Sequence, residues 1–301
     1  MKVLVLGIDG LEARLIEKWH IREYMQKYYG VHDVTVAVKP GEPIYTPLIW
    51  ASFLLGEPAY KYGFTARRIL IERDKRAYGI LAPLYALRVK LLGERRLGIR
   101  PILKKIGLYR RGRVKKVLHE VEALPKEALK HTIVEEARRR GFKVWVKEFP
   151  GLGDIKYAEV RATFYKYLDS PLEERVRRLN EIYEYSISTL REAVNSTQDN
   201  DLVLYYTALI DEANHMLYRP GNLKTMTLLA TYYKKLAKEI RLKTRNLQNT
   251  TVLIVSDHGY DPSVHEHSNY GFWSSNRSLP FNPTSILDFK EIILGILSHN
   301  K

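Results

Sequence analysis

The chain has 301 residues and a formal net charge of +15, because 49 lysines and arginines stand against 34 aspartates and glutamates. The excess is local: residues 66–116 hold 17 basic and 3 acidic side chains, whereas residues 1–65 hold seven of each and residues 117–301 hold 25 and 24. A hydrophobic content of 45% excludes a wholly disordered chain, and no apolar run approaches the roughly 20 residues of a membrane span. We therefore expect a nearly neutral globular protein with one strongly basic insert.

The sequence contains no cysteine, which excludes disulfides, thiolate catalysis and cysteine-based metal sites. Any metal ion would have to be held by histidine and carboxylate side chains. The apolar run after Met1 is too short for a secretory signal and ends in Asp9-Gly10. These features predict a cytoplasmic protein without a transmembrane segment.

The predicted elements alternate between strands and helices. A strand over Val3–Ile8 is followed by a helix over about Leu11–Tyr29 and a strand near Val34–Val38, and a short helix over Leu48–Leu55 ends at Gly56. The later elements are helices 126–140, 172–194, 223–245 and 288–298 and strands 143–147, 202–206 and 251–255.

This order predicts an α/β fold with a doubly wound, mostly parallel central sheet, helices on both faces and a basic helical insert. We expect one domain over residues 1–301, with the basic insert at 66–125 inside it.

Acids and a histidine follow predicted strands directly. Asp9 closes the first strand, and Asp257-His258-Gly259 follows the strand at 251–255. Taken singly, an aspartate at a strand end is often a helix cap, and Asp-His-Gly is often a polar turn. Because parallel strands bring their carboxyl ends to one edge of a sheet, their joint occurrence favours a shared site.

More possible ligands lie in the C-terminal half. Asp211 and His215 are four residues apart, so on a helix they share a face and could bind one ion, although such pairs are commonly surface contacts. His265 and His267 alternate, so one of them could face the same place. Together with the strand-end acids, these residues favour a metal site.

The set of motifs, in this order, resembles the alkaline phosphatase superfamily, and within it the type I phosphodiesterase/nucleotide pyrophosphatase branch. The resemblance covers residues 1–65 and 200–290. Its motifs are Asp9, Tyr45-Thr46-Pro47 with the helix after it, Asp211-x-x-x-His215, Ser256-Asp257-His258-Gly259 and the segment from His267 to Trp273. The last segment resembles the family's late histidine motif and favours His267 over His265.

The resemblance implies two divalent metal ions in a phosphate-binding pocket, and a threonine that attacks phosphorus to form a covalent intermediate. Zinc suits such a set of ligands, and manganese or iron stays open. One ion would take Asp211, His215 and His267, and the other would take Asp9, Thr46, Asp257 and His258.

Thr46 has a structural alternative to the role of nucleophile. Thr46 before Pro47 is a good helix-capping sequence. A threonine hydroxyl is a weak nucleophile that needs a base or a metal, and no histidine–acid pair lies beside Thr46 in the sequence. The amides at the start of the following helix would favour a phosphate. A metal pair about 4 Å apart would stabilise the attacking and leaving oxygens.

Fewer residues indicate how the rest of the substrate is bound. Nucleotide-cleaving relatives usually have an asparagine three residues after the nucleophile, but this position is Ile49 here. Trp50, Arg67 and Arg68 are possible substrate-binding residues.

The basic insert allows four interpretations. Leu81, Leu84, Leu87 and Leu91 have helical spacing, which is typical of an amphipathic helix on an anionic membrane surface. Basic residues with Tyr78, Tyr85 and Tyr109 could follow a nucleic-acid backbone. The insert could also be a cap that steers a phosphate-rich substrate, or a solvated excursion.

The sequence thus predicts a metal-dependent phosphoric ester hydrolase, a phosphodiesterase more than a monoesterase. One alternative is a phosphotransferase to a lipid or glycan head group. Another is a protein that binds nucleic acid or an anionic membrane through its insert.

Overall fold

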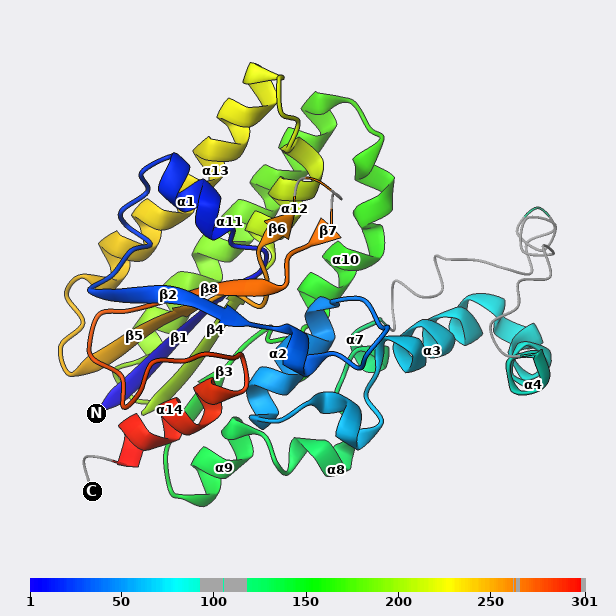
Figure 1. Ribbon diagram of the computed structural model, residues 1–301, viewed down its shortest axis with the longest axis horizontal. Helices are drawn as coiled ribbons and strands as arrows, with labels where there is room; N and C mark the ends of the chain where they lie inside the picture. Colours follow the sequence, from blue (N-terminus) through cyan, green and yellow to red (C-terminus); the bar gives the residue numbers. More distant parts are fainter. Residues whose placement is uncertain (93–104, 106–117, 262, 264–265, 299–301) are drawn as a thin grey trace.

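A six-stranded sheet forms the centre of the protein, in the order β2-β8-β5-β1-β4-β3 (Figure 1). This computed structural model describes residues 1–92, 105, 118–261, 263 and 266–298. The strands are β1 Lys2–Ile8, β2 Tyr28–Asp33, β3 Val144–Val146, β4 Leu202–Thr207, β5 Thr250–Val255 and β8 Tyr270–Ser275. β1 pairs in parallel with β4 and β5, and β3 with β4, whereas β8 is antiparallel to both β5 and β2. The predicted mostly parallel sheet is confirmed.

Helices cover both faces of this sheet, as predicted (Figure 1). On one face, α11 packs on β3 and β4 and contacts the helices α10, α12 and α13. On the other face, α14 packs on β1 and α9 packs on β3, and both of these helices also contact α2. The helices are α1 Ala13–Lys18, α2 Thr46–Leu55, α7 Leu118–Val121, α8 Lys126–Leu129, α9 Ile133–Arg139, α10 Ile155–Leu168, α11 Leu172–Ser196, α12 Leu209–Leu217, α13 Leu223–Thr244 and α14 Asp288–Ser298. Two short strands, β6 Tyr260–Asp261 and β7 Glu266–His267, pair with each other beside the main sheet.

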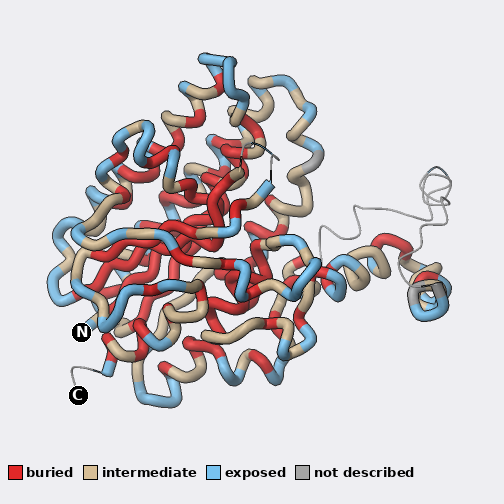
Figure 2. The backbone as a smooth tube through the Cα atoms, in the orientation of Figure 1, coloured by how far each residue is buried: buried red, intermediate tan, exposed pale blue. Residues whose placement is uncertain are grey.

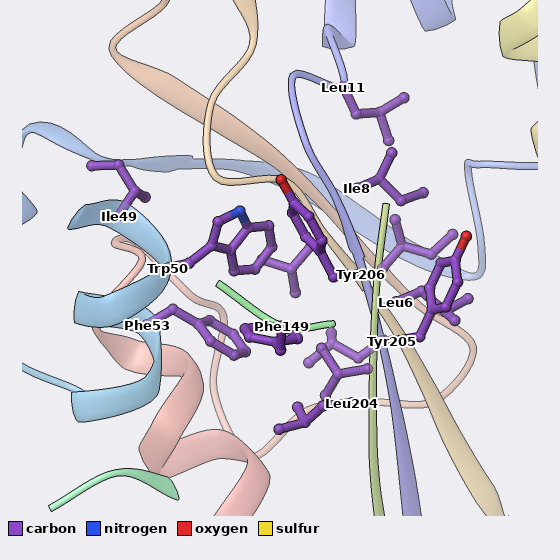
Figure 3. Packing of buried hydrophobic residues seen from close by; sticks show 14 of the residues in the cluster. Leu6, Ile8, Leu11, Ile49, Trp50, Phe53, Phe149, Leu204, Tyr205 and Tyr206 are labelled. Atoms are coloured by element: carbon purple, nitrogen blue, oxygen red, sulfur yellow. The ribbon is translucent and has the colours of Figure 1, made fainter. Parts of the chain in front are cut away.

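The middle of the sheet is fully buried. Every residue of β4 and β5 is buried, and Figure 2 shows the central strands as the most continuous buried part of the chain. Trp50 of α2 is 0% exposed and packs edge-on against Phe149 and Tyr206, at ring-centroid distances of 5.1 and 5.8 Å (Figure 3). Its ring lies so close to β1 that a Cβ at Gly7 would stand 3.0 Å from it. This packing fixes α2, and with it Thr46, against the sheet.

Two predicted elements near the N-terminus are wrong. The helix expected over Leu11–Tyr29 is only α1, and the chain then turns through His20, which has a positive φ of 51°. The strand expected at Val34–Val38 is a 3₁₀ turn, η1 (Thr35–Ala37). Val34 and Ala37 are both buried, and three residues apart they share one side of such a turn, so their apolar character does not require a strand.

The basic insert begins with two helices, α3 (Ala66–Tyr78) and α4 (Ala82–Leu92), joined by the 3₁₀ turn η3 (Gly79–Leu81). We call residues 66–92 the basic arm, and it extends away from the sheet in Figure 1. α3 packs against α7, the helix at which the described chain resumes, and α7 packs on α10. The remainder of the predicted insert, residues 93–104 and 106–117, lies outside the described residues. Within the described ranges no helix has the length and apolar content to cross a membrane.

Candidate functional site

Three aspartates and three histidines meet at one edge of the sheet. They come from the ends of β1 and β5, from α12 and from β7, which are distant in sequence. We call this group, with the threonine that begins α2, the strand-end cluster; its members are Asp9, Thr46, Asp211, His215, Asp257, His258 and His267. All seven residues assigned to metal ions from the sequence are thus brought together, whereas His265 lies outside the described residues.

One side of the cluster is built on α12. Asp211 and His215 occupy successive turns, with 3.4 Å between Asp211 Oδ1 and His215 Nε2. His267 Nε2 approaches from β7 and lies 3.9 Å from the same carboxylate oxygen and 3.4 Å from His215 Nε2. One carboxylate oxygen and two imidazole nitrogens therefore converge on a space of the size that one ion would occupy.

The other side holds the threonine. His258 Nε2 lies 3.2 Å from Asp9 Oδ1 and 3.3 Å from Asp257 Oδ2. Thr46 Oγ1 lies 3.3 Å from Asp9 Oδ1 and 3.2 Å from His258 Nε2. The hydroxyl therefore faces the cluster. Tyr45, not Thr46, is the N-cap of α2, so the capping alternative for Thr46 is wrong.

The two sides are contiguous. The rings of His258 and His267 stack at 3.8 Å with an angle of 16° between their planes. Asp211 also lies within ligand distance of Asp9 and His258, so it belongs to both groups. The side chains of both groups thus form one continuous set of possible metal ligands.

Backbone carbonyls orient the imidazoles. His258 Nδ1 donates to Gly259 O at 2.9 Å, and His267 Nδ1 donates to Ile44 O at 3.1 Å. Both rings consequently present an unprotonated Nε2 to the cluster whenever they are neutral, which is the form that binds metal ions. Tyr206 adds a hydrogen bond of 2.5 Å from its hydroxyl to Asp9 Oδ2. The sequence analysis missed Tyr206, although it sits in β4 directly opposite Gly7 of β1.

The electrostatics of the cluster call for a cation. Among the described residues no lysine or arginine pairs with Asp9, Asp211 or Asp257, and Asp211 Oδ1 and Asp257 Oδ2 have no hydrogen-bond partner. Buried carboxylates without compensation are costly, so the excess negative charge requires positive charge from a proton or an ion. Nitrogen and oxygen donors without thiolate fit zinc, manganese or iron.

Burial and the mutual interactions of these side chains shift their pKa values. Burial disfavours a charge on His258, but Asp257 and Asp9 outweigh this effect and raise its pKa to about 10. Burial, followed by the proximity of Asp9, also raises the pKa of Asp257 well above its ordinary value. Burial and the neighbouring His258 instead lower the pKa of His267 to about 4, which keeps this ring neutral.

A buried glutamate that the sequence analysis missed holds the turn after β5. Glu12 Oε2 accepts the amide of Tyr260 at 2.8 Å, and Glu12 Oε1 accepts the hydroxyl of Tyr270 at 2.5 Å. A Cβ at Gly259 would lie 2.2 Å from Glu12 Oε2 and 2.7 Å from Ser268 Oγ, so only glycine fits. This close packing presents His258 to the cluster at a fixed angle.

A second buried network lies behind α2. Arg161 of α10 pairs with Glu122 at 2.5 Å and with Asp154 at 2.6 Å, and the Tyr45 hydroxyl donates to Glu122 at 2.6 Å. Both acids are 1% exposed. The network therefore connects the chain that follows the insert to the residue before Thr46. No motif in the sequence marks it, because its members are scattered over residues 45–161.

The residues proposed from sequence for substrate binding do not join the cluster. Trp50 is fully buried among aromatic rings, which leaves it no surface for a substrate, and Ile49 is also 0% exposed (Figure 3). Arg67 and Arg68 are exposed on the first turn of α3, where Arg68 Nη1 lies 3.4 Å from Gly63 O.

The family model of type I phosphodiesterase / nucleotide pyrophosphatase matches residues 3–275. The chain belongs to this family. As a type I phosphodiesterase/nucleotide pyrophosphatase family member, it is a phosphoester hydrolase of the alkaline phosphatase superfamily. The match includes every member of the strand-end cluster. A search of curated proteins found no match.

Three solved structures are similar to this family member. They are PH0037 from Pyrococcus horikoshii (14% identity, TM-score 0.45, covering 100% of this chain and 99% of that one), murine ectonucleotide pyrophosphatase/phosphodiesterase 5 (14%, 0.41, 87% and 59%) and Ps i-CgsB in complex with neocarrahexaose (12%, 0.47, 100% and 73%). These values are too low to carry an argument, so the assignment depends on the family model.

Proposed function

We propose that the protein hydrolyses phosphoric esters with two divalent metal ions in the strand-end cluster and with Thr46 as the nucleophile. The observation that carries this proposal is the position of Thr46 Oγ1, which lies 3.3 Å from Asp9 Oδ1 and 3.2 Å from His258 Nε2. The hydroxyl thus stands at the edge of a carboxylate cluster that has no lysine or arginine partner among the described residues. Asp211, His215 and His267 would hold one ion, and Asp9, Asp257 and His258, with Thr46, the other.

Bound ions would supply positive charge to the phosphate oxygens and to the attacking and leaving oxygens. In the first step, Thr46 Oγ1 forms a bond to phosphorus and the bond from phosphorus to the leaving oxygen breaks. In the second, a water oxygen bonds to phosphorus, the bond to Thr46 Oγ1 breaks, and the threonine hydroxyl is restored. Asp9 and His258 lie where they can orient Oγ1 toward phosphorus, and the hydroxyl proton passes through solvent to the leaving oxygen.

A diester is the favoured substrate, on the basis of the family match. The buried Ile49 cannot offer the amide that nucleotide-cleaving relatives use, so the leaving group need not be a nucleotide. Transfer to an alcohol of a lipid or glycan head group would follow the same first step. We propose zinc as the native metal and the cytoplasm as the location.

The test uses metal analysis and hydrolysis of bis(p-nitrophenyl) phosphate. We expect bound divalent metal, loss of turnover with a chelator, and a fall of about 10³-fold or more in Thr46→Ala, with partial activity in Thr46→Ser. Thr65→Ala is the matched control, because Thr65 only caps α3. Mass spectrometry of acid-quenched enzyme should find a p-nitrophenyl phosphoryl group on Thr46, because one of the two aryl groups stays on phosphorus.

Turnover that survives both metal removal and Thr46→Ala would refute the proposal. Competing alcohols in the assay distinguish transfer from hydrolysis, because transfer would give an alkyl phosphodiester in place of the free phosphomonoester.

A further inference from the structure

The basic arm carries a stripe of large aliphatic side chains that face solvent. Ile80, Leu84, Leu87 and Leu91 are 81%, 65%, 53% and 70% exposed. Their spacings of four, three and four residues place them on one side of η3 and α4. Scattered exposed leucines are common, but a continuous row of four is typical of a surface that binds a partner.

The opposite side of the arm is packed, so the stripe does not result from a loose helix. Tyr85 is 8% exposed and stacks on Tyr78 of α3, at a ring-centroid distance of 4.6 Å. Ala77, Leu118 of α7 and Ala158 of α10 complete this small core. The arm is therefore anchored to the main body, with its apolar stripe directed outward.

Basic side chains border the stripe. With 3.6 residues per turn, Arg88 and Lys90 fall roughly a quarter turn to either side of it. The Arg88 guanidinium lies 5.3 Å above the Tyr85 ring, and Lys90 is exposed. The basic arm holds seven basic and two acidic residues, a net charge of +5. An apolar row between cations is the pattern of a helix that lies in the headgroup region of an anionic bilayer.

We propose that the basic arm docks the protein on a membrane surface that contains anionic lipids, with Ile80, Leu84, Leu87 and Leu91 in the acyl boundary and Arg88 and Lys90 at the phosphates. The stripe supplies the hydrophobic attraction, and the net charge supplies the selectivity for anionic lipid. This inference is independent of the hydrolase mechanism.

Two other partners fit the observations less well. Base stacking on nucleic acid needs exposed aromatic rings, but Tyr78 and Tyr85 are 4% and 8% exposed and stack on each other. A second copy of the chain, docked stripe to stripe, would bring two sets of basic residues together. An anionic membrane is the partner that satisfies both the aliphatic row and its borders.

The experiment is vesicle flotation of the full-length protein with phosphatidylcholine, with and without about one third phosphatidylserine. We expect wild type to float with the anionic vesicles. Replacing the stripe in Leu84→Ser/Leu87→Ser/Leu91→Ser should lower the ratio of bound to free protein at least tenfold. Lys90→Glu, which leaves the stripe intact, should lower it about fivefold. Leu223→Ser is the matched control, because Leu223 is 83% exposed at the start of α13, outside the arm.

The proposal is overturned if wild type does not float, or if the stripe variant floats as well as wild type. Binding of single-stranded nucleic acid that the stripe variant loses would assign the arm to nucleic acid. A wild-type dimer that the variant converts to a monomer would assign it to self-association. Hydrolysis of a soluble aryl phosphodiester, measured on the same samples, should be equal in all variants, so failure to bind vesicles leaves the proposed hydrolase mechanism unaffected.

Discussion

The strand-end cluster and the basic arm are opposites in charge and in packing. The cluster collects two buried carboxylates and one half-buried carboxylate without a lysine or arginine partner in the described chain, whereas the arm carries a net charge of +5 and exposes a row of aliphatic side chains. A sheet holds the cluster, whereas the arm joins the main core only through Ala66 and Ile69 on its first turns and packs farther out on a small separate core. The net charge of +15 is therefore distributed unevenly, and it does not describe the strand-end cluster.

The largest expected effect is at the carboxylate shared by both sides of the cluster. Asp211→Asn keeps the shape but removes the charge, so we expect hydrolysis to fall by about 10³-fold, or about 4 kcal/mol of barrier, with reduced bound metal. Turnover of an aryl phosphodiester and elemental analysis measure both. Glu266→Gln, on the exposed side of β7, is the control. Undiminished turnover in Asp211→Asn would show that the strand-end cluster is not the site of hydrolysis.

The next largest effect is expected at the buried network of Arg161, Glu122 and Asp154. Arg161→Met leaves Glu122 and Asp154 buried without their cation, and we expect a loss of about 3 kcal/mol in the free energy of unfolding. Urea denaturation followed by circular dichroism measures it. Arg177→Met is the control, because this side chain is 70% exposed and its pair with Glu174 contributes about 0.5 kcal/mol or less. Equal losses in the two variants would contradict this role for the network.

Acid sensitivity should distinguish the sheet from the arm, since the arm contains no histidine. Burial of His32 in β2 lowers its pKa to about 3, while the unfolded chain binds the proton near pH 6.5. The folded state therefore loses stability as the pH falls from about 6.5 towards 3.

Between pH 7 and pH 5.5, wild type should lose about 1 kcal/mol more than His32→Phe in urea unfolding. The Phe289 ring, 5.0 Å from His32, can pack against the substituted phenyl group. His20→Asn, at an exposed position with positive φ, should behave as wild type. Identical pH profiles for wild type and His32→Phe would show that His32 is not the source.

The smallest effect is expected on the arm itself. Leu87→Ala should change the free energy of unfolding by about 0.5 kcal/mol or less, because the side chain is 53% exposed. Leu204→Ala, in fully buried β4, should cost about 3 kcal/mol. Urea denaturation of both variants gives the comparison. A cost above about 1 kcal/mol at Leu87 would mean that the stripe is packed within the protein.

The sequence predicted those parts of the fold and site that depend on local pattern. Continuous apolar runs identified β1, β4 and β5, and an acid directly after β1 or β5 had to reach the common sheet edge because these strands are parallel. Asp9, Asp257 and His258 follow from that rule alone. Asp211 and His215 required only the four-residue repeat of a helix.

Features that depend on distant pairing could not be predicted. β2 is an edge strand in which half-buried and exposed residues alternate over 28–31 before the buried His32, and its partner β8 lies some 240 residues away. Arg161 can be buried because it pairs with Glu122 and Asp154. The sequence around these two acids has no pattern that predicts the pairing. His267 is assigned to the site only through the resemblance of its segment to the family's late histidine motif, because its position depends on the reversal of β8, which no periodicity reveals.

The packing of α3 against α7 has a consequence for how this protein can change. Ala77 and Leu118 share one small core, and Arg76 Nη2 lies 3.9 Å from Glu120 Oε2, so the insert leaves and re-enters the main body at neighbouring points. A replacement of different length or sequence between these points would not stretch the sheet or shift Thr46. The length of the chain between these points can therefore differ without a change in the spacing of its two ends.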